Sequence, residues 1–209
     1  MIMRTFWLLM FAGVLAGCGG GRVPATQYYK LDIPPAPTPA GPTVPASLRI
    51  EPFQTTVLLR QDRIVYRPSP VEVGFYEYHR WAEPPSDTVT KALADQLAKR
   101  RVFQSIQISE GEEKVDYVLR GRIERLQEVD YMGGVRVQVS ISAQLEDPAQ
   151  QTIWSSVASS DAVVTKGNVQ AVVAAMSQAS QQSISRLMTD VTKAVQQHAS
   201  VSSKGTPAH

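Results

Sequence analysis

The segment 135–146 constrains the fold more than any other part of this chain. Its apolar residues stand at every second position, with polar residues between them, from Val135 to Glu146. Because successive side chains of a strand point to opposite faces, this alternation predicts a strand with one buried and one solvated face. Such a strand needs a sheet around it and a second layer over its apolar face.

Neighbouring segments supply the remaining elements of this sheet and its cover. Further strands are predicted over residues 27–31, 48–57, 63–67, 71–78, 102–108, 115–126 and 152–164, with a bulge at Arg125-Leu126 and a tight turn at Gly133-Gly134. Apolar residues at helical spacing predict one helix that begins near Ser86 as its N-cap and ends near Arg101. A second helix is predicted from Gly167-Asn168 to about residue 198. We therefore expect an α+β fold, with two helices packed on one face of a mainly antiparallel sheet.

The N-terminus carries the pattern of an export signal. After Arg4, residues 5–16 form an uncharged, mainly apolar run, well short of the ~20 residues that a membrane-spanning helix needs. The run ends in Leu15-Ala16-Gly17-Cys18, which resembles the lipobox of bacterial lipoproteins. Small residues there let a peptidase approach the backbone between Gly17 and Cys18, and the thiol is the nucleophile that takes the lipid. The alternative is an ordinary secretory signal with an incidental cysteine.

Cys18 is the only cysteine of the chain, so no disulfide can form within it. We expect Cys18 to carry an N-acyl chain and an S-diacylglycerol, with palmitate-type acyl groups. Gly19 follows it, and by resemblance to Gram-negative sorting rules the absence of Asp there favours the periplasmic face of the outer membrane. The chain then divides into a signal peptide (1–17), a lipidated tether with a short strand and a proline-rich spacer (18–46), one α+β domain (47–200) and a disordered tail (201–209).

The sequence offers no catalytic or metal-binding pattern. It contains no glycine-rich phosphate loop, no nucleophile elbow and no cluster of His, Cys or acidic residues at metal-ligand spacing. The histidines His79, His198 and His209 are scattered, and we expect them to be structural or solvated. The formal net charge is +2 without a basic stripe, which argues against nucleic-acid binding. We expect neither enzymatic activity nor a cofactor apart from the covalent lipid.

Three stretches resemble the ABC-type transport auxiliary lipoproteins, the family that includes the paraquat-inducible protein C-like lipoproteins. They are Tyr28-Tyr29-x-Leu31, then Arg63-Ile64-Val65-Tyr66-Arg67, then Tyr76-x-Tyr78-x-Arg80-Trp81-Ala82-Glu83-Pro84-Pro85 before a helix. The resemblance covers residues 28 to about 195, and the third stretch is its most specific part. The proline spacer of this chain, residues 34–45, is longer than the family pattern.

The resemblance implies an outer-membrane lipoprotein that accompanies an ABC transport system built around an MCE-domain protein. Such systems carry lipids or other apolar compounds across the periplasm, and the auxiliary lipoprotein is expected to dock the conduit at the outer membrane. Two rival functions stay open. One is a periplasmic lipid-binding shuttle with an apolar cavity between sheet and helices, and the other is an assembly factor for an outer-membrane complex.

Two regions are candidate partner surfaces. Tyr66, Tyr76, Arg80 and Trp81 fall together in the sequence of the predicted hairpin and its exit. They predict either core packing, with Arg80 paired to Glu83 at the helix entrance, or an exposed aromatic and arginine patch of the kind enriched at protein interfaces.

The second candidate surface is an uncharged part of the C-terminal helix. Residues 169–185 carry no charge, and the positions outside the apolar stripe are Ala, Ser and Gln, including Ala174, Gln178 and Gln181. A lone exposed helix usually carries charge. This face therefore predicts packing against another copy of the chain or a partner, with a merely neutral surface as the alternative.

Overall fold

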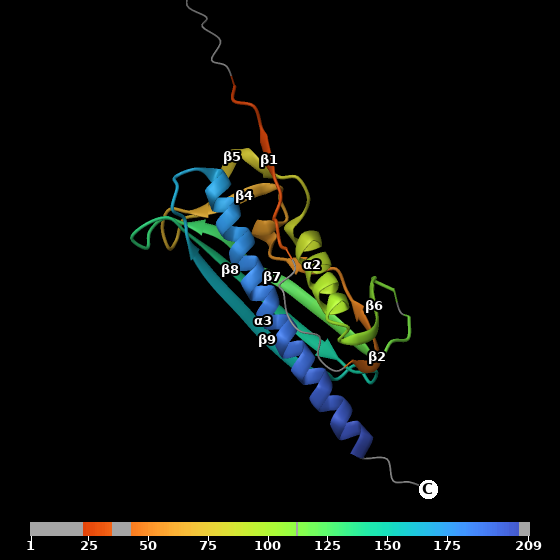
Figure 1. Cartoon of the computed structure of the whole chain (residues 1–209). Helices are drawn as coiled ribbons and strands as arrows, with labels where there is room; N and C mark the ends of the chain where they lie inside the picture. The colour runs from red at the N-terminus through yellow and green to blue at the C-terminus, as the bar shows by residue number, and fades with distance from the viewer. Residues whose placement is uncertain (1–22, 35–42, 112, 205–209) are drawn as a thin grey trace, which may run out of the picture.

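The computed structural model describes residues 23–34, 43–111 and 113–204 (Figure 1). Within these residues the chain forms nine strands, one short 3₁₀ helix and two α-helices. In chain order they are β1 (Gln27–Tyr29), β2 (Val44–Ile50), β3 (Gln54–Thr55), η1 (Val57–Leu59), β4 (Arg63–Arg67), β5 (Gly74–Trp81), α2 (Pro85–Lys99), β6 (Phe103–Ile108), β7 (Tyr117–Val129), β8 (Arg136–Glu146), β9 (Thr152–Val163) and α3 (Val169–Lys204).

The strands form one mixed sheet around β7. On one edge of β7, β8 pairs antiparallel, and β9 continues the antiparallel meander. On the other edge β2, β3 and β4 follow one another along β7, and all three pair with it in parallel. The expectation of a mainly antiparallel sheet is therefore wrong. The reason is topological, because β5, α2 and β6 carry the chain back to the start of β7, and such a crossover makes parallel pairing possible.

Both helices cover one face of the sheet, as predicted for an α+β fold. Helix α3 crosses β8 and β9, while α2 packs near β6 (Figure 1). The apolar phase of β8 points into this interface, and its members are all buried: Val137, Val139, Ile141, Ala143 and Leu145. The alternation in segment 135–146 thus predicts correctly which face of the sheet is covered.

Several local predictions are confirmed, and two are wrong in detail. The bulge of β7 lies between Ile123 and Arg125, and Gly133 and Gly134 adopt positive φ angles of 76° and 142° in the β7–β8 turn. Ser86 does not cap α2: Pro84 stands at the N-cap position without a side-chain cap, and the helix starts on a proline, whose fixed φ suits the first turn. Helix α3 runs to Lys204, beyond its predicted end and into the segment predicted as a disordered tail.

The folded domain also begins earlier than the predicted boundary at residue 47. Strand β1 pairs in parallel with β5, Leu31 is buried, and β2 starts at Val44. Most of the proline spacer, the residues from 205 on and the predicted signal segment with Gly17 and Cys18 lie outside the described residues. Among the helices that the structure describes, none combines the length and the apolar character required to cross a bilayer.

Candidate functional site

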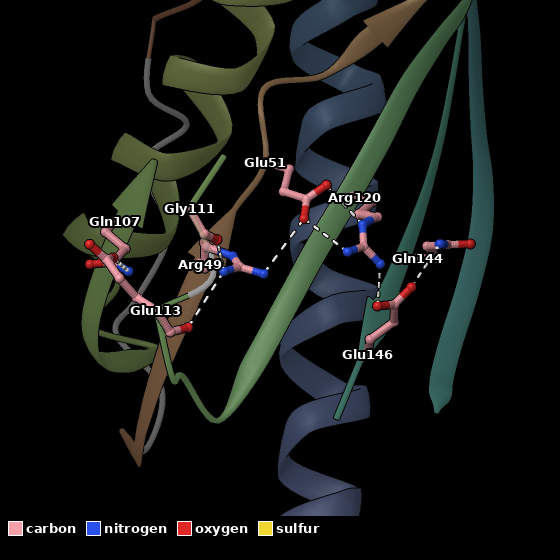
Figure 2. A network of polar contacts seen from close by, with 8 residues as sticks. All are labelled: Arg49, Glu51, Gln107, Gly111, Glu113, Arg120, Gln144 and Glu146. Atoms are coloured by element: carbon pink, nitrogen blue, oxygen red, sulfur yellow. Dashed lines mark hydrogen bonds and ion pairs between the residues drawn. The ribbon is translucent and has the colours of Figure 1, made fainter. Parts of the chain in front are cut away.

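A charged network lies on the face of the sheet that the helices leave uncovered (Figure 2). The Arg120 guanidinium of β7 donates to both carboxylate oxygens of Glu51 at 2.8 and 2.9 Å, and it also donates to Glu146 of β8. Glu51 lies 3.6 Å from Arg49 of β2. These contacts, with Glu51 first, raise the pKa of the Arg120 guanidinium above its ordinary value. Two arginines and two glutamates therefore neutralise one another across three strands.

The network also fixes the loop that follows β6. Arg49 donates to the backbone oxygens of Gly111 and Glu113, and Gln107 donates to the Glu113 side chain. Two hollows of about 490 Å³ and 990 Å³ flank Glu51 and Arg120, which line both of them. Polar groups line much of both hollows, so this face suits a polar partner surface better than an apolar ligand.

Sequence reasoning missed this network. The signal for it was weak but present, because Arg49 of β2 and Glu51, directly after β2, alternate with the buried residues Leu48 and Ile50. Arg120, which pairs with Glu51, stands 69 residues away on β7, and the second partner of Arg120, Glu146, lies on β8. Nothing in the local pattern of any one strand brings them together. Among the described residues no group of His, Cys, Asp and Glu could hold a metal ion.

Two residues of the first candidate surface, Tyr66 and Tyr76, belong to a packed row of rings, here called the aromatic row, with His79 and Tyr29. The Tyr66 and Tyr76 ring centroids lie 5.2 Å apart, Tyr76 and His79 lie 5.4 Å apart, and His79 and Tyr29 of β1 lie 5.6 Å apart. The Tyr76 hydroxyl donates to buried Glu128 at 2.7 Å. Burial, followed by this hydrogen bond, raises the pKa of the Tyr76 phenol above its ordinary value. The rings thus pack against each other and against β1, as in the core-packing alternative.

Of the other two members of this group, Trp81 follows the core-packing alternative, whereas Arg80 has a different partner from the one predicted. Trp81 is a core residue with 5% of its surface exposed, so it does not belong to a surface patch. Arg80 pairs with Asp62, with Nη1 at 2.8 Å from both carboxylate oxygens, and not with Glu83. Glu83 instead accepts a hydrogen bond from Thr88 at the start of α2. The Arg80–Asp62 pair is possible because Arg80 stands opposite Arg63 in the β4–β5 pairing, next to Asp62.

The uncharged face of α3 is partly covered by the chain itself. Residues 31–34, here called the strap, lie against it: Leu31 is buried, the Asp32 amide donates to Ser177 Oγ at 3.0 Å, and Gln181 donates to the Pro34 carbonyl at 3.1 Å. Small side chains at Ala175, Ser177 and Ala179 are buried. Intramolecular packing thus explains much of the uncharged stretch, including Gln181.

Two predicted residues of this face remain on the surface. Ala174 and Gln178 are exposed and line a hollow of about 500 Å³ at the N-terminal end of α3. The predicted surface residues therefore fall into two separate groups. One is the aromatic row together with the Arg80–Asp62 pair, and the other is the exposed part of α3 around Ala174 and Gln178.

Comparisons with solved structures show that the fold is a known one. The chain is similar to protein XCC0632 from Xanthomonas campestris, with 20% identity and a TM-score of 0.75 over 83% of this chain and 99% of that one. It is also similar to the hypothetical protein CT253 from Chlamydia trachomatis, with 8% identity and a TM-score of 0.54 over 73% of this chain and 98% of that one. A search of curated proteins finds no significant match.

A family model matches most of the described domain. The model for the ABC-type transport auxiliary lipoprotein component covers residues 29–187, which include the strap, the charged network, the aromatic row and most of the uncharged face of α3. This family is a component of transport systems and not an enzyme family, which agrees with the sequence-based expectation. The chain is thus a member of the ABC-type transport auxiliary lipoprotein family, associated with an ABC-type transport system.

Proposed function

We propose that this chain is anchored to the periplasmic face of the outer membrane through a lipid on Cys18. There it acts as the docking component of an ABC-type transport system. Its partner is an MCE-domain protein, and the system carries lipids or other apolar compounds across the periplasm. The chain binds no nucleic acid, and copies of it associate through the exposed part of α3 around Ala174 and Gln178.

The proposal rests on one observation, which is that β1 and the strap are packed into the folded domain. Strand β1 is part of the sheet, and the strap packs on α3, so the N-terminal segment is built into the domain. Gln27 is the ninth residue after Cys18, so the two are at most ~32 Å apart when the chain between them is fully extended. A lipid on Cys18 would therefore hold the whole domain close to the bilayer, as a docking module at a membrane requires.

The packing of the core favours docking over the rival shuttle. Fully buried side chains fill the space between sheet and helices, among them Leu93 and Leu97 of α2, Leu119 and Ile141 of the sheet, and Met176 and Ile184 of α3. The hollows of about 490 and 990 Å³ beside Glu51 and Arg120 lie on the opposite, charged face. A shuttle for lipids would need an apolar cavity of several hundred Å³. The alternative of an outer-membrane assembly factor is not favoured by any specific contact.

The test is a comparison of the native chain with Cys18→Ala, both expressed with the MCE-domain protein. We expect the native chain to fractionate with outer membranes and to capture the MCE-domain protein after crosslinking in intact cells. Cys18→Ala should fold with an unchanged melting temperature yet lose this in-cell capture, because it is no longer concentrated at the membrane. Equal capture by both proteins, or a native chain that stays in the soluble fraction, would overturn the proposal.

A further inference from the structure

We infer that one end of the sheet contacts the phospholipid surface directly. This end, here called the loop end, consists of the β4–β5 loop (residues 68–73), the β7–β8 turn (130–135) and the β9–α3 loop (164–168). The inference rests on the proposed lipid anchor and adds to it a second, protein-borne contact with the membrane.

Strand pairing places the three loops side by side. Tyr66 pairs with Gly74, Arg67 with Val129, Val129 with Arg136, and Arg136 with Val163. These four pairs form one continuous row across β5, β4, β7, β8 and β9. Each of the three loops begins directly beyond this row. Figure 1 shows the loops projecting from the same end of the molecule, opposite to the C-terminal end of α3.

The lipidated segment leaves the domain toward this end. Strand β1 runs parallel to β5, with Gln27 paired to His79, and β5 starts at Gly74 in the row of paired residues. The chain before Gln27 therefore runs in the direction of the start of β5, and in Figure 1 it leaves the domain at the end away from the C-terminal end of α3. Cys18 precedes Val23 by five positions in the chain, which limits their separation to ~18 Å. The lipid consequently enters the bilayer near the loop end.

The loop tips carry exposed apolar side chains. Val71 is 93% exposed, Met132 is 53% exposed and Tyr131 is 39% exposed. Single exposed apolar residues are common, but three at the tips of adjacent loops beside a lipid attachment point match the chemistry of an interfacial contact. An amphipathic tyrosine suits the headgroup level of a bilayer. At the opposite end, the described loops carry mainly polar side chains, including Glu110, Glu113, Lys114, Asp116, Asp147 and Gln150.

The charge of the loop end decides which lipid surface fits. Between residues 67–74, 129–136 and 164–168 there are three basic side chains (Arg67, Arg136, Lys166) and two acidic ones (Glu72, Asp130). This near balance gives little attraction for an anionic surface. We therefore assign the contact to apolar insertion into a phospholipid bilayer, without a requirement for anionic headgroups.

Single introduced cysteines test this inference in the lipidated full chain. Because Cys18 is the only native cysteine and its thiol is acylated in the mature lipoprotein, a polarity-sensitive fluorophore attaches only to the new thiol. The label is placed at Val71→Cys or Met132→Cys, with Ala149→Cys in the exposed β8–β9 turn as the matched control. Each labelled protein is reconstituted into phosphatidylethanolamine vesicles with or without phosphatidylglycerol, and some vesicles contain a quencher on the acyl chains.

We expect the labels at 71 and 132 to shift to shorter wavelength and to be quenched, equally in both kinds of vesicle, while the label at 149 stays unchanged. Labels at 71 and 132 that behave like the label at 149, in protein that floats with the vesicles, would overturn this inference and leave the anchor intact. A shift that appears only with phosphatidylglycerol would overturn the assignment to apolar insertion. Failure of all three proteins to float would instead count against the proposed anchor itself.

Discussion

Glu128 is a carboxyl group that the fold buries beside a phenol. It lies on β7 with 5% of its surface exposed, and it accepts the Tyr76 hydroxyl at 2.7 Å. Burial raises the pKa of the Glu128 carboxyl above its ordinary value, and the hydrogen bond from Tyr76 offsets only part of that effect. Compared with the unfolded chain, the folded state therefore binds the Glu128 proton more strongly, and deprotonation at higher pH opposes folding.

Replacing Glu128 by Gln should remove the unfavourable effect that the deprotonated, buried carboxyl has on the free energy of unfolding. Because the folded-state pKa is raised, the favourable contribution of Glu128 is complete below its ordinary pKa of 4.5 and is lost as the pH rises through the folded-state value. We expect Glu128→Gln to be more stable than the native chain near pH 7, by about 1 kcal/mol in urea unfolding, and no more stable at pH 4. Glu72→Gln, at an exposed position in the β4–β5 loop, is the control. A native chain that gains stability relative to Glu128→Gln on going from pH 4 to pH 7 would contradict the expected sign.

At the scale of elements, β1 and the strap bind the N-terminal segment to the domain. The Ala82 amide donates to the Tyr29 carbonyl at 2.7 Å, Leu31 is 4% exposed within the hydrophobic core, and Ser177 and Gln181 of α3 hold the backbone of residues 32 and 34. Helix α3 has small side chains where the strap crosses it, so the backbone can approach closely. The uncharged stretch of α3 is thus in large part an internal packing surface.

Truncating Leu31 should loosen this connection. Leu31→Ala removes a buried side chain, and we expect the free energy of unfolding to fall by about 2–3 kcal/mol. The amide of Ala82 should exchange its hydrogen faster than in the native chain, because β1 opens more often. Lys30→Ala, one residue away and exposed, should change neither quantity. An unchanged unfolding free energy in Leu31→Ala would mean that the strap is not part of the cooperative fold.

At the scale of the whole molecule, the domain is polarised along its long axis. The N-terminal segment and the loop end lie at one end, while the C-terminal part of α3 and the β8–β9 turn lie at the other (Figure 1). The charged face with Arg49, Glu51, Arg120 and Glu146 runs along the side that the helices leave open. An anchor at one end would thus present this face at a fixed height above the membrane.

Lengthening the segment between Cys18 and β1 should separate membrane anchoring from docking of the partner. An insertion of about ten Gly and Ser residues between Gly21 and Arg22 adds up to ~35 Å of reach. We expect the lengthened protein to remain in the outer-membrane fraction but to capture less of the MCE-domain protein by in-cell crosslinking, because the height of the domain is no longer fixed. Substitution of both Gly20 and Gly21 by Ser, which keeps the length constant, is the control. Undiminished capture after the insertion would show that docking does not depend on this height.

Much of the secondary structure followed from local patterns. The alternation in residues 135–146 predicted the buried face of β8, the phase slip at Arg125 located the bulge of β7, and Asn168 marked the start of α3, where its side chain accepts the Ala171 amide. Each of these signals acts over a few residues, and burial of one face or satisfaction of one helix end is enough to produce it.

Tertiary structure alone decided the rest. The parallel pairing of β2, β3 and β4 with one edge of β7, the burial of Trp81, the choice of Asp62 as the partner of Arg80, and the packing of the strap on α3 each join residues far apart in the sequence. Periodicity reports that a face is buried, but it does not report which strand or helix covers it. That choice depends on how the whole chain closes around β7. Local sequence patterns therefore predict most of the elements, and the fold decides which elements become neighbours.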